Sequence, residues 1–98
     1  MAEIRWTEEA HRWLKDIYDY IALDNDEAAQ HVVNNIFEKV QMLKQFPEIG
    51  YKYREEPEGE IRIILYKHYR IAYLLKAQNK IDILGIFHGA LDIDKYFF

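Results

Sequence analysis

The chain of 98 residues contains no cysteine. This absence excludes a disulfide scaffold, a thiolate metal site and a cysteine nucleophile. Half of the residues are hydrophobic, so a core can form without disulfides or a structural metal, and the length suits one compact domain. We therefore expect a single domain that spans residues 1–98.

Long apolar runs and a basic surplus are missing as well. No segment approaches the roughly 18 apolar residues of a membrane-spanning helix, and the N-terminus (MAEIRWTEEAHRW) lacks the apolar core of a signal peptide. We therefore expect a cytoplasmic protein with no membrane partner. The formal net charge is −4, whereas nucleic-acid-binding proteins usually carry a strong basic surplus. The charge favours a protein partner over a nucleic acid.

Only two prolines and four glycines interrupt the chain, which indicates long elements and few loops. Polar and apolar residues alternate over 3–7, which predicts a short strand, and Thr7 can then cap a helix. Apolar residues recur at helical spacing over 10–21 and again over 29–43, with the polar turn LDND between them. The pattern predicts an antiparallel helical hairpin, whose second helix Pro47 ends.

The second half of the chain is rich in branched and aromatic residues. Residues 48–60 read as a loop with glycines at both ends. Three β-rich runs follow, at 60–66, 69–75 and 80–88. The predicted fold is α+β in the order β-α-α-β-β-β, with the helical hairpin packed on one face of a small antiparallel sheet and a short C-terminal helix or tail.

The register of the first β-hairpin decides which face carries the arginines. A two-residue turn at 67–68 would place Arg70 on the apolar face, where an unpartnered guanidinium is costly to bury. A three-residue loop at 67–69 instead places Arg62, Tyr66 and Arg70 together on the polar face. We therefore expect both arginines on the sheet face that the helices leave bare.

Four segments in this order resemble the RelE/ParE superfamily of type II toxin–antitoxin toxins: WTEEAHRWLKDIYDYIA, LKQFPEIG, IRIILYKHYRIAYLL and IDILGIFHGALDI. The resemblance covers nearly the whole chain and is closer to ParE-like members. It implies a RelE/ParE-like fold and a growth-inhibiting toxin of the plasmid-stabilisation kind, which a cognate antitoxin neutralises in a joint oligomer. ParE-like members bind DNA gyrase, whereas RelE-like members cleave mRNA on the ribosome.

Cleavage of RNA through its own 2′-OH needs an acid, a base and cations for the charge of the transition state. His88 is the candidate acid or base, and Arg62 and Arg70 are the candidate phosphate ligands. Many family members carry a further basic residue after this histidine, but here the segment is HGALD. This departure and the negative charge favour a ParE-like toxin that inhibits by binding. A RelE-like ribonuclease is the alternative, and a non-toxic relative that only binds antitoxin is the second.

A toxin that acts by binding needs an exposed recognition surface, not a catalytic set. Aromatic and arginine side chains are enriched at the energetic centres of such surfaces. The four histidines show no paired ligand spacing and their elements are expected to lie apart, so we expect no metal site and no cofactor. The candidate partner-binding residues are Arg62, Tyr66, Arg70, Tyr96, Phe97 and Phe98.

Overall fold

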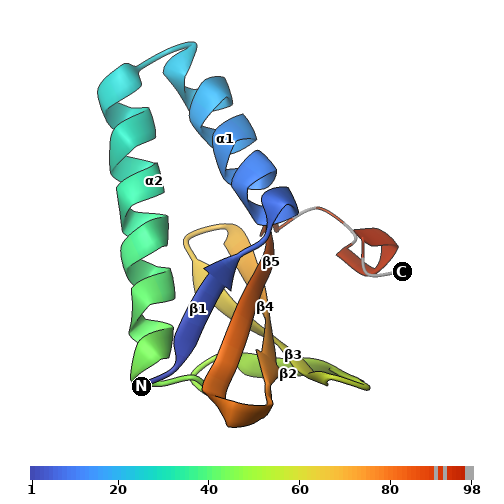
Figure 1. The fold of residues 1–98 in the computed structure, drawn as a ribbon. Helices are drawn as coiled ribbons and strands as arrows, with labels where there is room; N and C mark the ends of the chain where they lie inside the picture. The colour runs from blue at the N-terminus through green and yellow to red at the C-terminus, as the bar shows by residue number, and fades with distance from the viewer. Residues whose placement is uncertain (90, 92, 97–98) are drawn as a thin grey trace.

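A computed structural model of the protein describes residues 1–89, 91 and 93–96, and places a helical hairpin against one face of a twisted sheet (Figure 1). The predicted α+β class and element order are confirmed, with one additional strand. The strands are β1 (Glu3–Trp6), β2 (Tyr51–Glu56), β3 (Gly59–Tyr66), β4 (Tyr69–Lys76) and β5 (Lys80–His88). The helices are α1 (Glu8–Ala22) and α2 (Asp26–Gln41), with 3₁₀ turns η1 (Met42–Lys44), η2 (Ala77–Asn79) and η3 (Ile93–Tyr96).

Both helices begin at capping side chains that the sequence supplies. The Thr7 hydroxyl accepts a hydrogen bond from the Ala10 amide at 3.1 Å, and Asn25 Oδ1 accepts one from the Ala28 amide at 3.0 Å. Each cap satisfies an amide that the first helical turn leaves without a partner. Asn25 also separates the two helices, so the polar LDND segment fixes the point at which the hairpin reverses. No helix among the described residues is long and apolar enough to cross a membrane.

The five strands form one sheet in the order β1-β5-β4-β3-β2. The sheet is mixed, since β1 pairs with β5 in parallel while the other neighbours are antiparallel. The predicted loop at 48–60 was wrong, because Tyr51–Glu56 forms the edge strand β2. Four of its six residues are charged, which suits an edge strand that pairs on one side only but hides the alternation expected of a strand.

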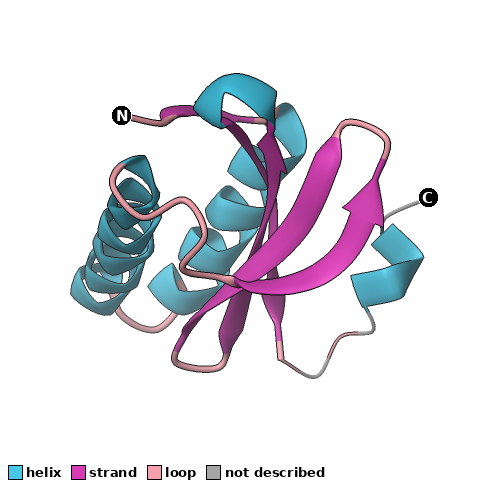
Figure 2. Ribbon diagram, turned by 90° about the horizontal axis from the view of Figure 1, so that it is seen from below, coloured by secondary structure: helices cyan, strands magenta, loops and turns pink. Residues whose placement is uncertain are grey.

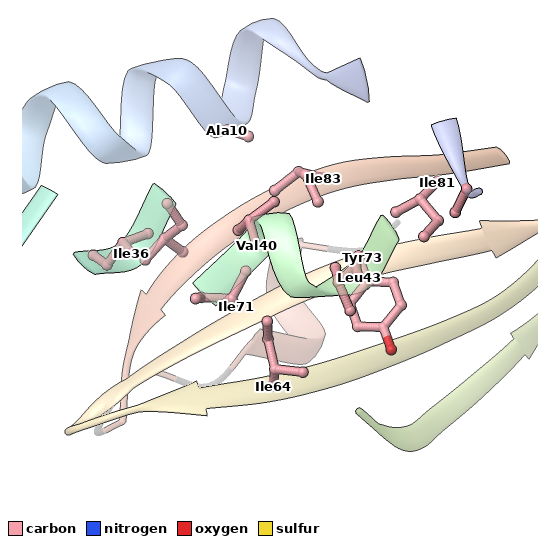
Figure 3. Close-up of a cluster of buried hydrophobic side chains, with 11 residues drawn as sticks. Ala10, Ile36, Val40, Leu43, Ile64, Ile71, Tyr73, Ile81 and Ile83 are labelled. Carbon is pink, nitrogen blue, oxygen red and sulfur yellow. The ribbon is translucent and has the colours of Figure 1, made fainter. Parts of the chain in front are cut away.

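The main core lies between the helical hairpin and the sheet. Figure 3 shows side chains from α1, α2 and η1 meeting those of β3, β4 and β5. All of these side chains are almost completely buried, and burial of large aliphatic groups of this kind supplies most of the stability of a small domain. The labelled members are Ala10, Ile36, Val40, Leu43, Ile64, Ile71, Tyr73, Ile81 and Ile83.

The opposite face of the sheet is apolar and partly covered. Ile63, Ala72 and Phe87 form a second cluster with Ile93, which belongs to the 3₁₀ turn η3. Figure 2 shows the long helices on one side of the sheet and this short C-terminal helix on the other. The expectation that the helices leave a bare polar face was therefore wrong. The chain uses its own C-terminal segment to cover part of that face.

Candidate functional site

The two arginines lie on opposite faces of the sheet. Strands β3 and β4 pair Tyr66 with Tyr69, so the turn contains only residues 67–68. In this register Arg62 faces Tyr73 across the strands, whereas Arg70 faces Leu65. Successive residues of a strand point to opposite faces. Arg62 therefore lies on the helix side with Tyr73, Arg70 lies on the other side, and the predicted three-residue loop and shared arginine face were wrong.

Arg62 is tolerated on the helix side because it has backbone partners there. Its side chain is only 16% exposed, and its Nη1 donates to the Gly50 carbonyl at 2.6 Å and the Glu48 carbonyl at 3.1 Å. Its Nη2 lies 3.5 Å from a carboxylate oxygen of Glu60. These bonds offset the cost of removing the guanidinium from water. The two carbonyl groups lie 14 and 12 residues before Arg62, in a segment that register arguments on one hairpin do not include.

Tyr73 holds the same segment from the neighbouring strand. Its hydroxyl donates to the Pro47 carbonyl at 2.7 Å and accepts from the Gly50 amide at 3.1 Å. Burial raises the pKa of Tyr73, so the hydroxyl stays protonated and able to donate. A Cβ atom at Gly50 would lie 2.8 Å from the Ile63 carbonyl oxygen, which explains the glycine. Arg62 and Tyr73 together fix residues 47–50, here named the 47–50 turn.

Arg70 performs a similar task at the other end of the sheet. Its Nη2 donates to the Leu91 carbonyl at 2.6 Å and lies 3.4 Å from the Gly89 carbonyl oxygen. These bonds hold the segment after β5, next to the point where Ile93 enters the second apolar cluster. In this structure both arginines therefore bind backbone carbonyl groups.

The three predicted catalytic residues do not converge. His88 pairs with Tyr69, whereas Arg62 pairs with Tyr73, four residues further along β4. This offset corresponds to about 13 Å along the strand at roughly 3.3 Å per residue. Arg70 projects from the opposite face. General acid–base chemistry needs its groups within hydrogen-bond reach of one reacting centre, and these side chains do not form such a centre.

A groove of about 480 Å³ instead opens between the helical hairpin, the β3–β4 turn and the end of β5. We name it the hairpin groove. Its polar residues come from α1, the β3–β4 turn, the start of β4 and the end of β5, and Tyr20 at its rim is 78% exposed. Burial, followed by the nearby phenols of Tyr20 and Tyr66, raises the pKa of Tyr69, which stays a neutral phenol at physiological pH. Apolar walls come from Trp13, Ile17, Ile21, Val32, Ile86 and Leu91, and polar groups from Asp16, Tyr20, Lys67, His68, Tyr69 and His88.

Sequence reasoning missed most of this groove. Among the predicted site residues that the structure describes, only His88 lines it. The expectation that the elements of the four histidines lie apart was wrong for one pair, because the rings of His68 and His88 have centroids 5.1 Å apart. The signal was present in the sequence, because three successive antiparallel strands place the turn that contains His68 at the same end of the sheet as the last residue of β5.

The predicted partner-binding aromatics occupy different places. The Tyr66 hydroxyl accepts a hydrogen bond from Asn35 Nδ2 at 3.0 Å, which ties β3 to α2. Tyr96 packs edge-on against Trp13, with ring centroids 5.3 Å apart, and remains 48% exposed. Phe97 and Phe98 lie outside the described residues. Tyr96 thus docks on the protein with one edge and presents the rest of its ring at the surface.

The fold and the sequence both match one protein family. The model of the family described as "ParE toxin of type II toxin-antitoxin system, parDE" matches residues 4–93. The chain belongs to this family. A solved structure, "Chromosomal ParDE TA system from P. aeruginosa", is 28% identical and superposes with a TM-score of 0.72, covering 90% of this chain and 96% of that one. No significant match is found among curated proteins. The resemblance to the RelE/ParE superfamily, and to its ParE branch, is thereby confirmed.

Proposed function

We propose that this ParE-family protein is a toxin that binds and inhibits DNA gyrase in the cytoplasm, and that a cognate antitoxin neutralises it by occupying the hairpin groove. The observation that carries the proposal is the contrast between two regions. Arg62 and Arg70 are engaged with backbone carbonyl groups on opposite faces, whereas the hairpin groove is apolar, open and rimmed by exposed aromatic surface. This contrast supports inhibition by binding over catalysis.

The groove suits an amphipathic segment of an antitoxin. Apolar grooves between helices and sheets commonly receive the apolar face of a helix. Charged groups of both signs stand at the rim, Asp16 on α1 and Lys67 in the β3–β4 turn, so a bound segment can pair with each. Tyr20 is positioned as an anchor, because exposed aromatic side chains at a groove are typical centres of binding energy.

The target is tested by inducing the protein in cells and measuring gyrase supercoiling and the integrity of ribosome-bound mRNA in parallel. We expect inhibited supercoiling with intact mRNA. Ribosome-dependent cleavage that disappears in a His88→Ala variant would instead establish the ribonuclease alternative. Normal growth with neither effect would indicate a relative that has lost toxicity and retains only antitoxin binding.

The proposed antitoxin site is tested by replacing each of two exposed aromatic residues with glutamate and comparing the two variants. Tyr20→Glu places a charge at the groove, whereas Phe46→Glu places the same charge at a side chain 56% exposed and outside it. The ligand is the product of an antitoxin-like reading frame that is first sought beside the gene of this protein. Loss of a hot-spot contact of about 2 kcal/mol weakens binding roughly 30-fold, and we expect that loss for Tyr20→Glu only. Equal affinity for the two variants would exclude the hairpin groove as the antitoxin site.

A further inference from the structure

Two histidines meet at the mouth of the hairpin groove. His68 belongs to the β3–β4 turn and His88 ends β5, and the pairing of Tyr69 with His88 sets their alignment. The backbone is fixed on both sides of the pair, because the Gly89 amide donates to the His68 carbonyl at 2.7 Å. The two rings have centroids 5.1 Å apart and planes inclined by 48°. The pairing of β4 with β5 and this bond after it therefore hold the two imidazoles together.

This separation matches the geometry of two imidazoles that share one metal ion. With a metal–nitrogen distance of about 2.1 Å, a coordinated ion lies about 3.2 Å from the centre of each ring. Two such rings at a tetrahedral angle have centres about 5.2 Å apart. The observed centroid separation of 5.1 Å agrees with this value.

We propose that His68 and His88 bind one divalent transition-metal ion of the zinc, nickel or copper type. Imidazole nitrogen suits these ions, whereas Mg²⁺ and Ca²⁺ prefer oxygen ligands. Within the described part of the chain, no group of three or more His, Cys, Asp or Glu side chains is placed to hold a metal. The ion would therefore keep open positions for water or for a donor from a partner, in contrast to a closed structural zinc site.

The surroundings set the properties of the proposed site. Lys67 precedes His68 and adds a positive charge, whereas Asp16 lines the facing wall of the groove. An ion at this position would tie the β3–β4 turn to the end of β5. It would also add positive charge at the mouth of the groove.

The test titrates ZnCl₂ into the untagged protein by calorimetry, since a histidine tag would itself bind the metal. We expect one ion per chain for the wild type and at least about tenfold weaker binding for His68→Gln and for His88→Gln. His11→Gln and His31→Gln are the matched controls, because these histidines are also exposed but lie on α1 and α2. The controls should bind zinc as tightly as the wild type, and MgCl₂ should give no heat of binding.

Two further measurements keep the outcome decisive. Circular dichroism in EDTA establishes that each variant is folded, so that lost binding reports lost ligands. The visible spectrum of the Co²⁺-loaded wild type should contain bands of nitrogen coordination that both His68→Gln and His88→Gln remove. Absence of zinc binding in the wild type would overturn the proposal. So would equal weakening by all four histidine variants, which would indicate dispersed surface binding.

Discussion

Removal of one oxygen atom in Tyr73→Phe should destabilise the whole domain. The Tyr73 side chain is completely buried, and its hydroxyl bonds two backbone groups of the 47–50 turn. The substitution leaves the buried Gly50 amide without its acceptor, which costs about 1–3 kcal/mol. The Pro47 carbonyl lies in a half-buried turn that water can reach, so losing the hydrogen bond to it costs about 0.5–1.5 kcal/mol. The expected total is about 1.5–4.5 kcal/mol.

Thermal and urea unfolding followed by circular dichroism measure this loss. A change of 1 kcal/mol shifts Tm by about 4–8 °C in a domain of this size, so Tm should fall by at least about 6 °C. Tyr51→Phe is the matched control, because that side chain is 49% exposed and should change the free energy of unfolding by less than about 0.5 kcal/mol. Equal stability of Tyr73→Phe and the wild type would refute the role assigned to the hydroxyl.

The same variant should alter how the free energy of unfolding falls at alkaline pH. Burial raises the pKa of Tyr73 in the folded state above the value of about 10 in the unfolded chain. The stability that the neutral Tyr73 hydroxyl contributes is therefore fully present below about pH 10 and is lost as the pH rises through the folded-state pKa. Burial raises the pKa of Tyr69 in the same direction. Tyr73→Phe should thus weaken the alkaline loss of stability without abolishing it, as pH-dependent urea titrations will show.

Three further substitutions test separate contacts. Asp82 accepts from Arg5 at 3.0 Å and from Lys76 at 2.9 Å, bonds that hold its pKa below the usual range. Asp82→Asn should cost about 1–3 kcal/mol at pH 7, and the loss should shrink as the pH falls from about 4 through the folded-state pKa, measured by urea unfolding. Gly50→Ala forces a Cβ against backbone oxygen and should cost about 1–3 kcal/mol in the same assay. Arg70→Met removes the donor to the Leu91 carbonyl, so amide hydrogen exchange after β5 should accelerate while β1–β4 exchange as in the wild type. Unchanged exchange after β5 would contradict this role for the arginine.

The helical half of the fold could be predicted from local patterns. Thr7 and Asn25 stand where the helices begin, and the apolar stripes on either side describe the buried faces. Such signals depend on residues within a few positions of one another, so no tertiary information is needed. The strand β2 was missed for the opposite reason. Its charged sequence becomes a strand only because β3 offers a free edge to pair with.

The predicted register of the β3–β4 hairpin was wrong because the prediction left out hydrogen-bond partners that are distant in sequence. The prediction assigned a burial cost to arginine without including the carbonyl groups of the 47–50 turn. Those acceptors allow Arg62 to face the helix side. The turn therefore contains two residues, and Lys67 lies in the left-handed region at a φ of 53°. The error then displaced the site inference that depended on the register, which was the shared arginine face.

The corrected register also changes the role that can be assigned to the two arginines in this family member. Arg62 fixes the turn before β2, and Arg70 fixes the segment after β5, so each stabilises a connection at one end of the sheet. A guanidinium in such a position would have to release its carbonyl partners before it could bind a phosphate. The hairpin groove has no comparable barrier, because its walls are apolar and its rim is exposed. Recognition at the groove therefore demands less rearrangement of this fold than phosphate binding at either arginine.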